Sequence, residues 1–233
     1  MRFVGYTAVA ALICAGANAY ADDETCSAWD NYSAPAEGTV FTYQVRHQDE
    51  DIAVRIVREI VDIDGEDVEY AQHFASVDGS RPDSPPRNQI LAAGMFPRSE
   101  GEMADGNPVR IRDYDQSVLS VLSGLDPEGM AVLESSETSS MNDRTRTVTA
   151  PFTVIFNRCD TIEIGDTAEP VRVYDIVYTA RTYVAGRRPQ ADMAAEKQNR
   201  YYMSERYGWP LRIDSATGHI EVVDISHADP DAG

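Results

Sequence analysis

Lysine is almost absent from this sequence, and positive charge is scarce in general. Lys197 is the only lysine, and lysine and arginine together number 20 against 39 aspartate and glutamate residues, which gives a formal net charge of -19 at pH 7. The basic stripe that binds nucleic acid through counterion release is therefore missing. We exclude nucleic-acid partners and stable membrane insertion of the processed chain, and we expect its arginines to occupy paired positions.

Cysteine is rare as well. Cys26 and Cys159 fit neither a CxxC redox motif nor a zinc site. In an oxidising compartment two such cysteines usually pair, so we predict a Cys26–Cys159 disulfide, with two separate buried thiols as the alternative. The third cysteine, Cys14, follows the bulky Ile13, whereas lipoprotein processing requires a small residue there, so lipidation is not expected.

Long apolar runs are missing except near the start of the chain. Arg2 gives a short positive start, and Val4–Ala17 is uncharged but shorter than the roughly 20 residues that a membrane-spanning helix needs. Small residues then precede an acidic stretch, so we expect a signal peptide at residues 1–21, cleaved after Ala21. Cleavage after Ala19 and a retained membrane anchor are the alternatives. The mature chain is expected to be periplasmic or secreted.

Motifs for catalysis and cofactor binding are missing too. The sequence has no GxSxG, HExxH, glycine-rich phosphate loop or GxGxxG. The acidic run 62–67 does not match a calcium-binding loop, because its glycine comes too early and the final glutamate is out of register. We expect no catalytic residue, no metal and no cofactor. The scattered histidines are His47, His73, His219 and His227, and the carboxylates interpreted as a solvated sheet edge are Glu59, Asp62, Glu66, Asp67 and Glu69.

Alternation of apolar and polar residues is what the sequence does have. Val40–His47 alternates, and Ile52–Ile63 alternates with an apparent change of phase near Arg58 that suggests a bulge. Asp64 and Gly65 form a hairpin-turn signal, and the alternation continues beyond them. Further strands are expected at 145–156, 171–184, 201–205, 211–214 and 219–225. The pattern indicates a single β-rich domain at residues 22–225 and a disordered tail at 226–233.

One or two short helices are expected between the strands. Asp115 is a good N-cap ahead of an apolar stripe from Val118 to Leu125. A second helix is expected at Ile90–Phe96, ended by Pro97, and a helical turn at Ala191–Lys197. The fold class expected is mainly β (α+β).

The last third of the chain resembles a known group of periplasmic proteins. Arg200–Asp214 joins an aromatic strand, a turn and a Pro-hydrophobic-Arg strand, and Gly218 opens a closing strand. This order is similar to the end of LolA/LolB-like half-barrel proteins and related envelope families, and Cys159–Thr182 is similar to the central hairpin of such sheets. The resemblance implies a curved antiparallel sheet, or half-barrel, with one or two short helices inserted between its halves.

Two functions of different classes follow from these features. The first is a carrier or sensor that holds an apolar ligand, such as an acyl chain, on a face lined by aromatic side chains. The second is a structural or protein-interaction component of the envelope without a small-molecule ligand. In the alternative interpretation the aromatics only form the core. The candidate lining residues are Phe41, Tyr43, Tyr70, Phe74, Phe152 and Phe156.

Overall fold

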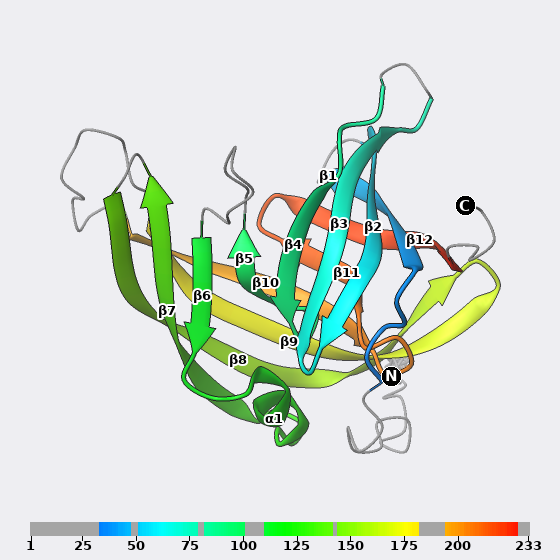
Figure 1. Ribbon diagram of the computed structural model, residues 1–233. Coiled ribbons are helices and arrows are strands. Elements are labelled where there is room, and N and C mark those ends of the chain that lie inside the picture. The colour runs from blue at the N-terminus through cyan, green and yellow to red at the C-terminus, as the bar shows by residue number, and fades with distance from the viewer. Residues whose placement is uncertain are drawn as a thin grey trace, which may run out of the picture.

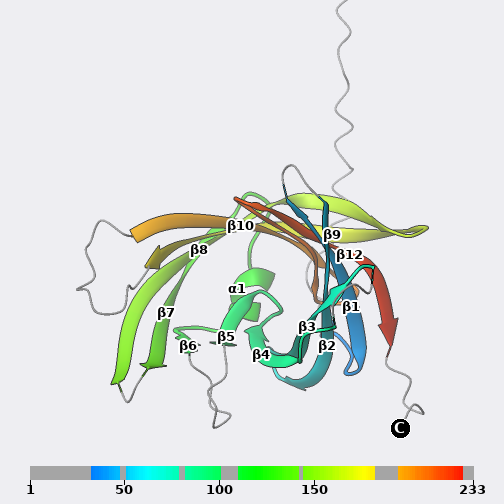
Figure 2. The same cartoon turned by 90° about the horizontal axis from the view of Figure 1, so that it is seen from above.

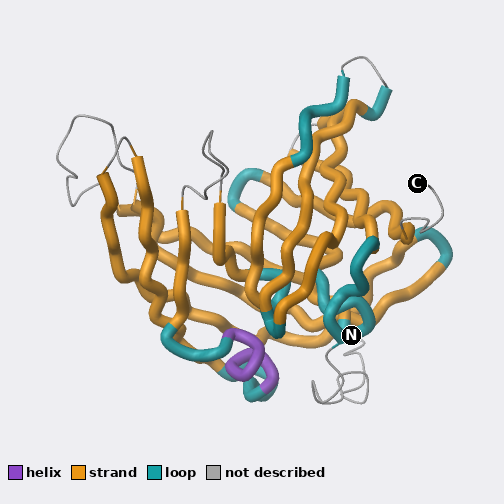
Figure 3. The backbone as a smooth tube through the Cα atoms, in the orientation of Figure 1, coloured by secondary structure: helices purple, strands orange, loops and turns teal. Residues whose placement is uncertain are grey.

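The alternating stretches form long strands in a computed structural model, which describes residues 33–47, 51–78, 82–100, 110–141, 144–181 and 194–227. Within these ranges the chain has twelve strands and one short helix (Figures 1 and 3). The helix is α1 (Val118–Ser123). The strands are β1 (Thr39–His47), β2 (Asp51–Asp64), β3 (Asp67–Ser76), β4 (Arg87–Ala92), β5 (Phe96–Glu100), β6 (Arg110–Tyr114), β7 (Met130–Met141), β8 (Arg144–Ile164), β9 (Thr167–Arg181), β10 (Ala194–Ser204), β11 (Pro210–Ser215) and β12 (Gly218–His227).

The twelve strands form a closed antiparallel barrel. Each strand pairs with its neighbours in sequence, and β1 also pairs with β12 along all nine of its residues, from Thr39 opposite His227 to His47 opposite Gly218. The expected antiparallel, mainly β class is confirmed, but the curved sheet closes into a full barrel where a half-barrel was expected. A half-barrel leaves two free edges, whereas here the edges of the first and last described strands satisfy each other.

Two apolar clusters fill the barrel. One contains Phe152, Phe156 and Tyr174 from β8 and β9, and the other contains Phe41, Tyr70 and Trp209. Alternate residues of a strand face opposite sides of the sheet, so each strand contributes one apolar face to these clusters.

The short helix α1 closes the lower end of the barrel (Figure 1), where it lies inside the ring of strands when the molecule is seen from above (Figure 2). Val118 and Leu122 are fully buried in the first cluster. Ser117 is the N-cap, and Glu66 of the β2–β3 turn accepts hydrogen bonds from the Ser117 hydroxyl (2.6 Å) and the Leu119 amide (3.0 Å). Asp115 was expected to cap this helix; instead it accepts a hydrogen bond from the Glu134 amide at 3.0 Å, which ties it to β7.

The helix expected at Ile90–Phe96 is wrong. These residues form the end of β4, a tight turn and the start of β5. Ala93 and Gly94 in the turn have φ values of 47° and 70°, a left-handed conformation that an α-helix does not contain. A Cβ at Gly94 would lie 3.0 Å from Cε3 of Trp209, so glycine permits this turn to lie directly on the indole ring.

The expected helical turn at Ala191–Lys197 is also wrong where it can be compared, because β10 begins at Ala194; residues 191–193 lie outside the described ranges. β12 runs to His227, two residues into the segment expected as a tail, and residues 228–233 lie outside the described ranges. The signal peptide lies outside them too.

The hairpin turn at Asp64–Gly65 is confirmed, with Gly65 at φ 62° between β2 and β3. The bulge expected near Arg58 is misplaced. The β2–β3 register shifts between Ile60 and Asp62 instead, and Arg58 keeps the same parity as the buried residues Ile56 and Ile60. What resembled a change of phase is thus an arginine on the inward face of the barrel.

Candidate functional site

The six candidate lining residues do not form one surface. Phe41, Tyr43 and Tyr70 belong to one apolar cluster, and Phe152 and Phe156 to the other, with each of the five at most 7% exposed. Phe74 differs, because it is 47% exposed although it pairs with Ile56 and shares its inward face. Five of these aromatics therefore lie in the core, and only Phe74 offers apolar area to a ligand.

A cleft of about 660 Å³ lies elsewhere, between β10 and the turn that joins β11 to β12. Volumes of this size are common for small-molecule sites. Most of the residues that line it are polar or charged, although their apolar atoms contribute much of its surface. The lining residues are Asp175, Tyr178, Glu196, Lys197, Gln198, Asn199, Arg200, Asp214, Ser215, Ala216 and Thr217.

The cleft forms because β11 is shorter than β10. β9 pairs with β10 from Ala194 to Ser204, whereas β11 pairs with it only from Arg200 to Met203. Within the described residues, 194–199 have no partner strand on that side, and β10 extends past the β11–β12 turn (Figures 1 and 2). The wall of the barrel therefore has an opening at this position.

Residues from both faces of the sheet line this opening. Lys197 pairs with Tyr178, which pairs in turn with the buried Phe152, so these side chains belong to the inward face. Tyr178 also stacks on Phe152, with ring centroids 5.3 Å apart. Gln198 and Arg200, at alternate positions, belong to the outward face.

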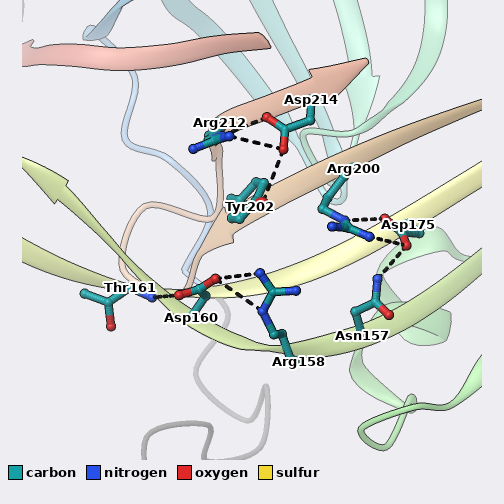
Figure 4. A network of polar contacts seen from close by, with 9 residues as sticks. All are labelled: Asn157, Arg158, Asp160, Thr161, Asp175, Arg200, Tyr202, Arg212 and Asp214. Atoms are coloured by element: carbon teal, nitrogen blue, oxygen red, sulfur yellow. Dashed lines mark hydrogen bonds and ion pairs between the residues drawn. The ribbon is translucent and has the colours of Figure 1, made fainter. Parts of the chain in front are cut away.

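A polar network frames the outward side of the cleft (Figure 4). Arg200 donates to both carboxylate oxygens of Asp175, at 2.7 and 3.0 Å, and Asn157 donates to the same carboxylate at 2.5 Å. Burial alone would raise the pKa of Asp175, but these hydrogen bonds outweigh it and hold the pKa below its usual value. Asp175 is therefore a structural anion and not a proton donor at neutral pH.

A second group in Figure 4 joins β10 to β11. Arg212 donates to Asp214 at 2.7 Å, and the Tyr202 hydroxyl donates to Asp214 at 3.2 Å. Burial and the neighbouring carboxylate raise the pKa of Tyr202. These contacts fix the end of β11, and with it the rim of the cleft.

Arg58 projects into the barrel between two tyrosine rings. Its guanidinium carbon lies 5.0 Å from the ring centroid of Tyr43 and 5.3 Å from that of Tyr70. Its Nε donates to Gln72 Oε1 at 2.9 Å, while its Nη1 is buried and has no hydrogen-bond acceptor. The indole Nε1 of Trp209 is buried without an acceptor as well.

Tyr201 connects the cleft with this arginine. Burial raises the pKa of the Tyr201 hydroxyl to about 12, and its smaller influences are Asn199 and Tyr178 from the cleft and Arg58 from β2. The hydroxyl is therefore neutral at physiological pH. Tyr201 therefore interacts both with Tyr178, which lines the cleft, and with Arg58.

The described residues contain no group of three or more metal-ligating side chains. The histidines of the described strands stay apart, and the side chain of His47 lies outside the described set. Of the carboxylates near the β2–β3 turn, Glu66 and Asp67 form ion pairs with Arg98, at 2.6 and 2.8 Å, and Glu69 accepts from Asn88 at 2.8 Å. These carboxylates therefore contact basic or amide side chains, and they do not form a carboxylate pair suited to acid/base catalysis.

Sequence reasoning missed both Arg58 and the cleft. The signal for Arg58 was present, since a polar residue interrupts an otherwise regular inward face. The cleft has only an indirect signal, namely the sole lysine on a strand that is longer than its neighbour. Cys159 lies in β8 against the first cluster, and Cys26 lies outside the described residues, so the disulfide stays a prediction.

No helix in the described ranges is long and apolar enough to span a bilayer.

No protein-family model and no curated protein matches the chain. Among solved structures, the chain is similar to the hypothetical lipoprotein YmcC from Escherichia coli, with 12% identity, coverage of 81% of this chain and 85% of that chain, and a TM-score of 0.43. A proposed exported protein with a YmcC-like fold from Bacteroides fragilis gives 12% identity, 86% and 100% coverage, and a TM-score of 0.47. A proposed lipoprotein from Parabacteroides distasonis gives 8% identity, 86% and 99% coverage, and a TM-score of 0.46. Likenesses of this strength say nothing about function, and they do not confirm the resemblance to LolA/LolB-like proteins.

Proposed function

We propose that this protein is an exported, non-catalytic binding protein whose barrel takes a small amphipathic molecule through the opening between β10 and the β11–β12 turn. The observation that carries the proposal is the cleft of about 660 Å³, where inward-facing and outward-facing residues meet at a gap in the wall. A molecule bound there contacts the inside of the barrel without unfolding any strand pair.

The apolar part of the ligand is assigned to the inward face above the core. Phe74 is 47% exposed on that face, and Tyr178 is half-buried at the opening. An exposed aromatic side chain that faces the interior of a barrel gains from contact with an apolar ligand, by roughly 25 cal/mol for each Å² removed from water. An acyl chain is the simplest group that fits this surface.

Export is part of the same proposal and rests on the leader at residues 1–21. The test is N-terminal sequencing of the protein recovered from outside the cytoplasm, which should begin at Asp22. A protein that retains Met1 and sediments with membranes would contradict it.

Native mass spectrometry of the processed protein, purified from its own compartment, tests the binding function. A bound mass of lipid size is expected on the wild-type protein. Ala216→Trp, at an exposed position in the β11–β12 turn, should remove the bound mass by filling the cleft. Asp166→Trp, in the exposed β8–β9 turn, is the matched control and should retain it. A wild-type protein that is always empty, and that binds no added lipid, would refute the proposal.

A second candidate function is an interaction component of the envelope. Met130 and Val132, on the same face of β7, are 65% and 49% exposed, and such apolar area often marks a contact with another protein. If the wild-type protein is empty, loss of a co-purifying protein in Met130→Ser would favour this function.

A further inference from the structure

Arg58 is a positive charge inside the barrel without a counter-ion among the described residues. Its guanidinium interacts electrostatically with tyrosines alone, namely Tyr43, Tyr70 and Tyr201. Five other partly buried arginines each have a carboxylate in direct contact. These pairs are Arg98 with Glu66, Arg112 with Glu137, Arg172 with Glu205, Arg200 with Asp175, and Arg212 with Asp214.

This lack of a partner is unexpected in a chain with 39 acidic residues. Removing a charge from water is costly, and buried charges are normally paired or bound to a ligand. The rings of Tyr43 and Tyr70 offset part of the cost through cation–π contacts. The Tyr43 hydroxyl oxygen interacts with both the guanidinium and the Trp209 indole, but no hydrogen bond of good geometry reaches Arg58 Nη1 or Trp209 Nε1.

A second unsatisfied donor lies beside the first. Trp209 Nε1 and Arg58 both adjoin the hydroxyl of Tyr43, and Trp209 also packs edge-on against Tyr70, with ring centroids 5.4 Å apart. The hydroxyl of Tyr43 donates its own proton to the carbonyl of Pro210 at 2.7 Å, and that of Tyr70 donates to Gln89 at 2.6 Å. The group thus contains two buried donors that need an acceptor.

The tyrosines cannot provide the missing negative charge. Burial raises the pKa of the Tyr43 hydroxyl well above its ordinary value, and it raises that of Tyr201 as well. Both hydroxyls therefore stay protonated at any physiological pH. The guanidinium of Arg58 is always charged, so this group of side chains carries a net positive charge.

We propose that Arg58 and Trp209 form a binding site inside the barrel for an anionic group, a carboxylate or a phosphate, carried by the ligand. The inference rests on the proposed function, which it deepens by naming the polar end of the amphipathic molecule. An oxyanion supplies both missing acceptors at once and neutralises the arginine. The apolar part of the ligand then extends along the inward face toward Phe74 or Tyr178.

The ligand reaches the site through a side-chain movement. Arg58 as a whole is half-buried while its Nη1 is covered, so a ligand oxygen must displace a neighbouring group. Gln72 accepts the hydrogen bond from Arg58 Nε and lies near the middle of β3. An amide on a flexible stem can rotate at low cost, so Gln72 is the side chain assigned to move.

Isothermal titration of the processed protein tests this site with decanoate, decyl phosphate and decanol, which share one chain length, and with acetate and inorganic phosphate, which have no chain. We expect the two acids to bind the wild type, and decanol to bind about 10- to 100-fold more weakly, which is the range for losing a charge-assisted hydrogen bond. Arg58→Met should abolish this preference by weakening the acids and leaving decanol unchanged. Trp209→Phe should weaken the acids by about 3- to 10-fold.

Arg55→Met is the matched control, because Arg55 is an exposed arginine on the outward face of the same strand and should bind as the wild type does. Equal affinity for decanoate and decanol in the wild type overturns the anion site but leaves the proposed function intact. Equal affinity for acetate or phosphate and for the long-chain acids supports the anion site but overturns the amphipathic ligand. Binding of none of the five compounds overturns both.

Discussion

Two arginine-to-methionine substitutions should have very different effects on stability, because one arginine has a carboxylate partner and the other has none. Arg200→Met leaves the carboxylate of Asp175 buried, at 5% exposure, with the uncharged Asn157 and Gln198 as its remaining partners. Breaking a buried pair in this way costs about 3–5 kcal/mol, and because the Arg200 side chain is 35% exposed we expect about 2–4 kcal/mol.

Arg58→Met should change the free energy of unfolding by no more than about 1 kcal/mol. The loss of the Gln72 hydrogen bond, about 1.5–3 kcal/mol, is opposed by the removal of an unsatisfied buried donor, about 1–3 kcal/mol. The cation–π contacts with Tyr43 and Tyr70 are replaced in part by contacts of the thioether with the same rings.

Urea denaturation at pH 7, followed by circular dichroism, measures both variants, and equal slopes against urea would make their midpoints comparable. A loss of 2 kcal/mol or more in Arg58→Met would show that this arginine has a stabilising partner. The reasoning behind the interior anion site would then be refuted.

Three further predictions concern acid stability, glycine positions and the disulfide. The pKa values of Asp175 and Glu66 are both lowered in the folded state. Each carboxylate therefore contributes stability that is complete above its unfolded pKa, about 3.9 and 4.3, and that is lost as the pH falls through its folded pKa. Urea midpoints measured between pH 7 and pH 3 should decline less steeply in Asp175→Asn and Glu66→Gln than in the wild type. Gly94→Ala should be clearly more destabilising than Gly65→Ala, because the new Cβ meets Trp209 at 3.0 Å at position 94 and nothing within 4 Å at position 65. Gly65→Ala should cost only about 1 kcal/mol, for its positive φ. Similar urea midpoints for the two variants would contradict the close contact with Trp209. A non-reducing digest of the processed protein should give a Cys26–Cys159 peptide, and reduction should lower the unfolding free energy by at most about 4–5 kcal/mol; two alkylated thiols without prior reduction would exclude the bond.

Strand positions could be read from the sequence because they depend on neighbouring residues. Gly65 adopts the positive φ that marks a hairpin turn, and the alternation in Val40–His47 matches β1 closely. Local rules failed where a tertiary contact decided the outcome. Ile90–Phe96 has an apolar pattern that suits a short helix, but the turn on Trp209 imposes left-handed backbone on Ala93 and Gly94.

The candidate site was beyond local rules for a different reason. The cleft depends on the difference in length between β10 and β11, and the surroundings of Arg58 depend on which strands lie beside β2. Aromatic residues alone could not separate the core from a ligand surface, since Phe41 and Phe74 look alike in sequence but are 0% and 47% exposed. The barrel closure was missed because no local sequence pattern in β1 or β12 indicates that these two strands pair.

Because β12 supplies the second edge of β1, the ring cannot be completed until residues 218–227 have been synthesised. A polypeptide that stops short of these ten residues would present two long ladders of open amide and carbonyl groups, which are templates for aggregation. The C-terminal strand β12 thus completes the barrel by pairing with β1. Premature termination before residue 218 should accordingly yield insoluble protein, even though every buried residue of the two clusters except Val222 would still be present.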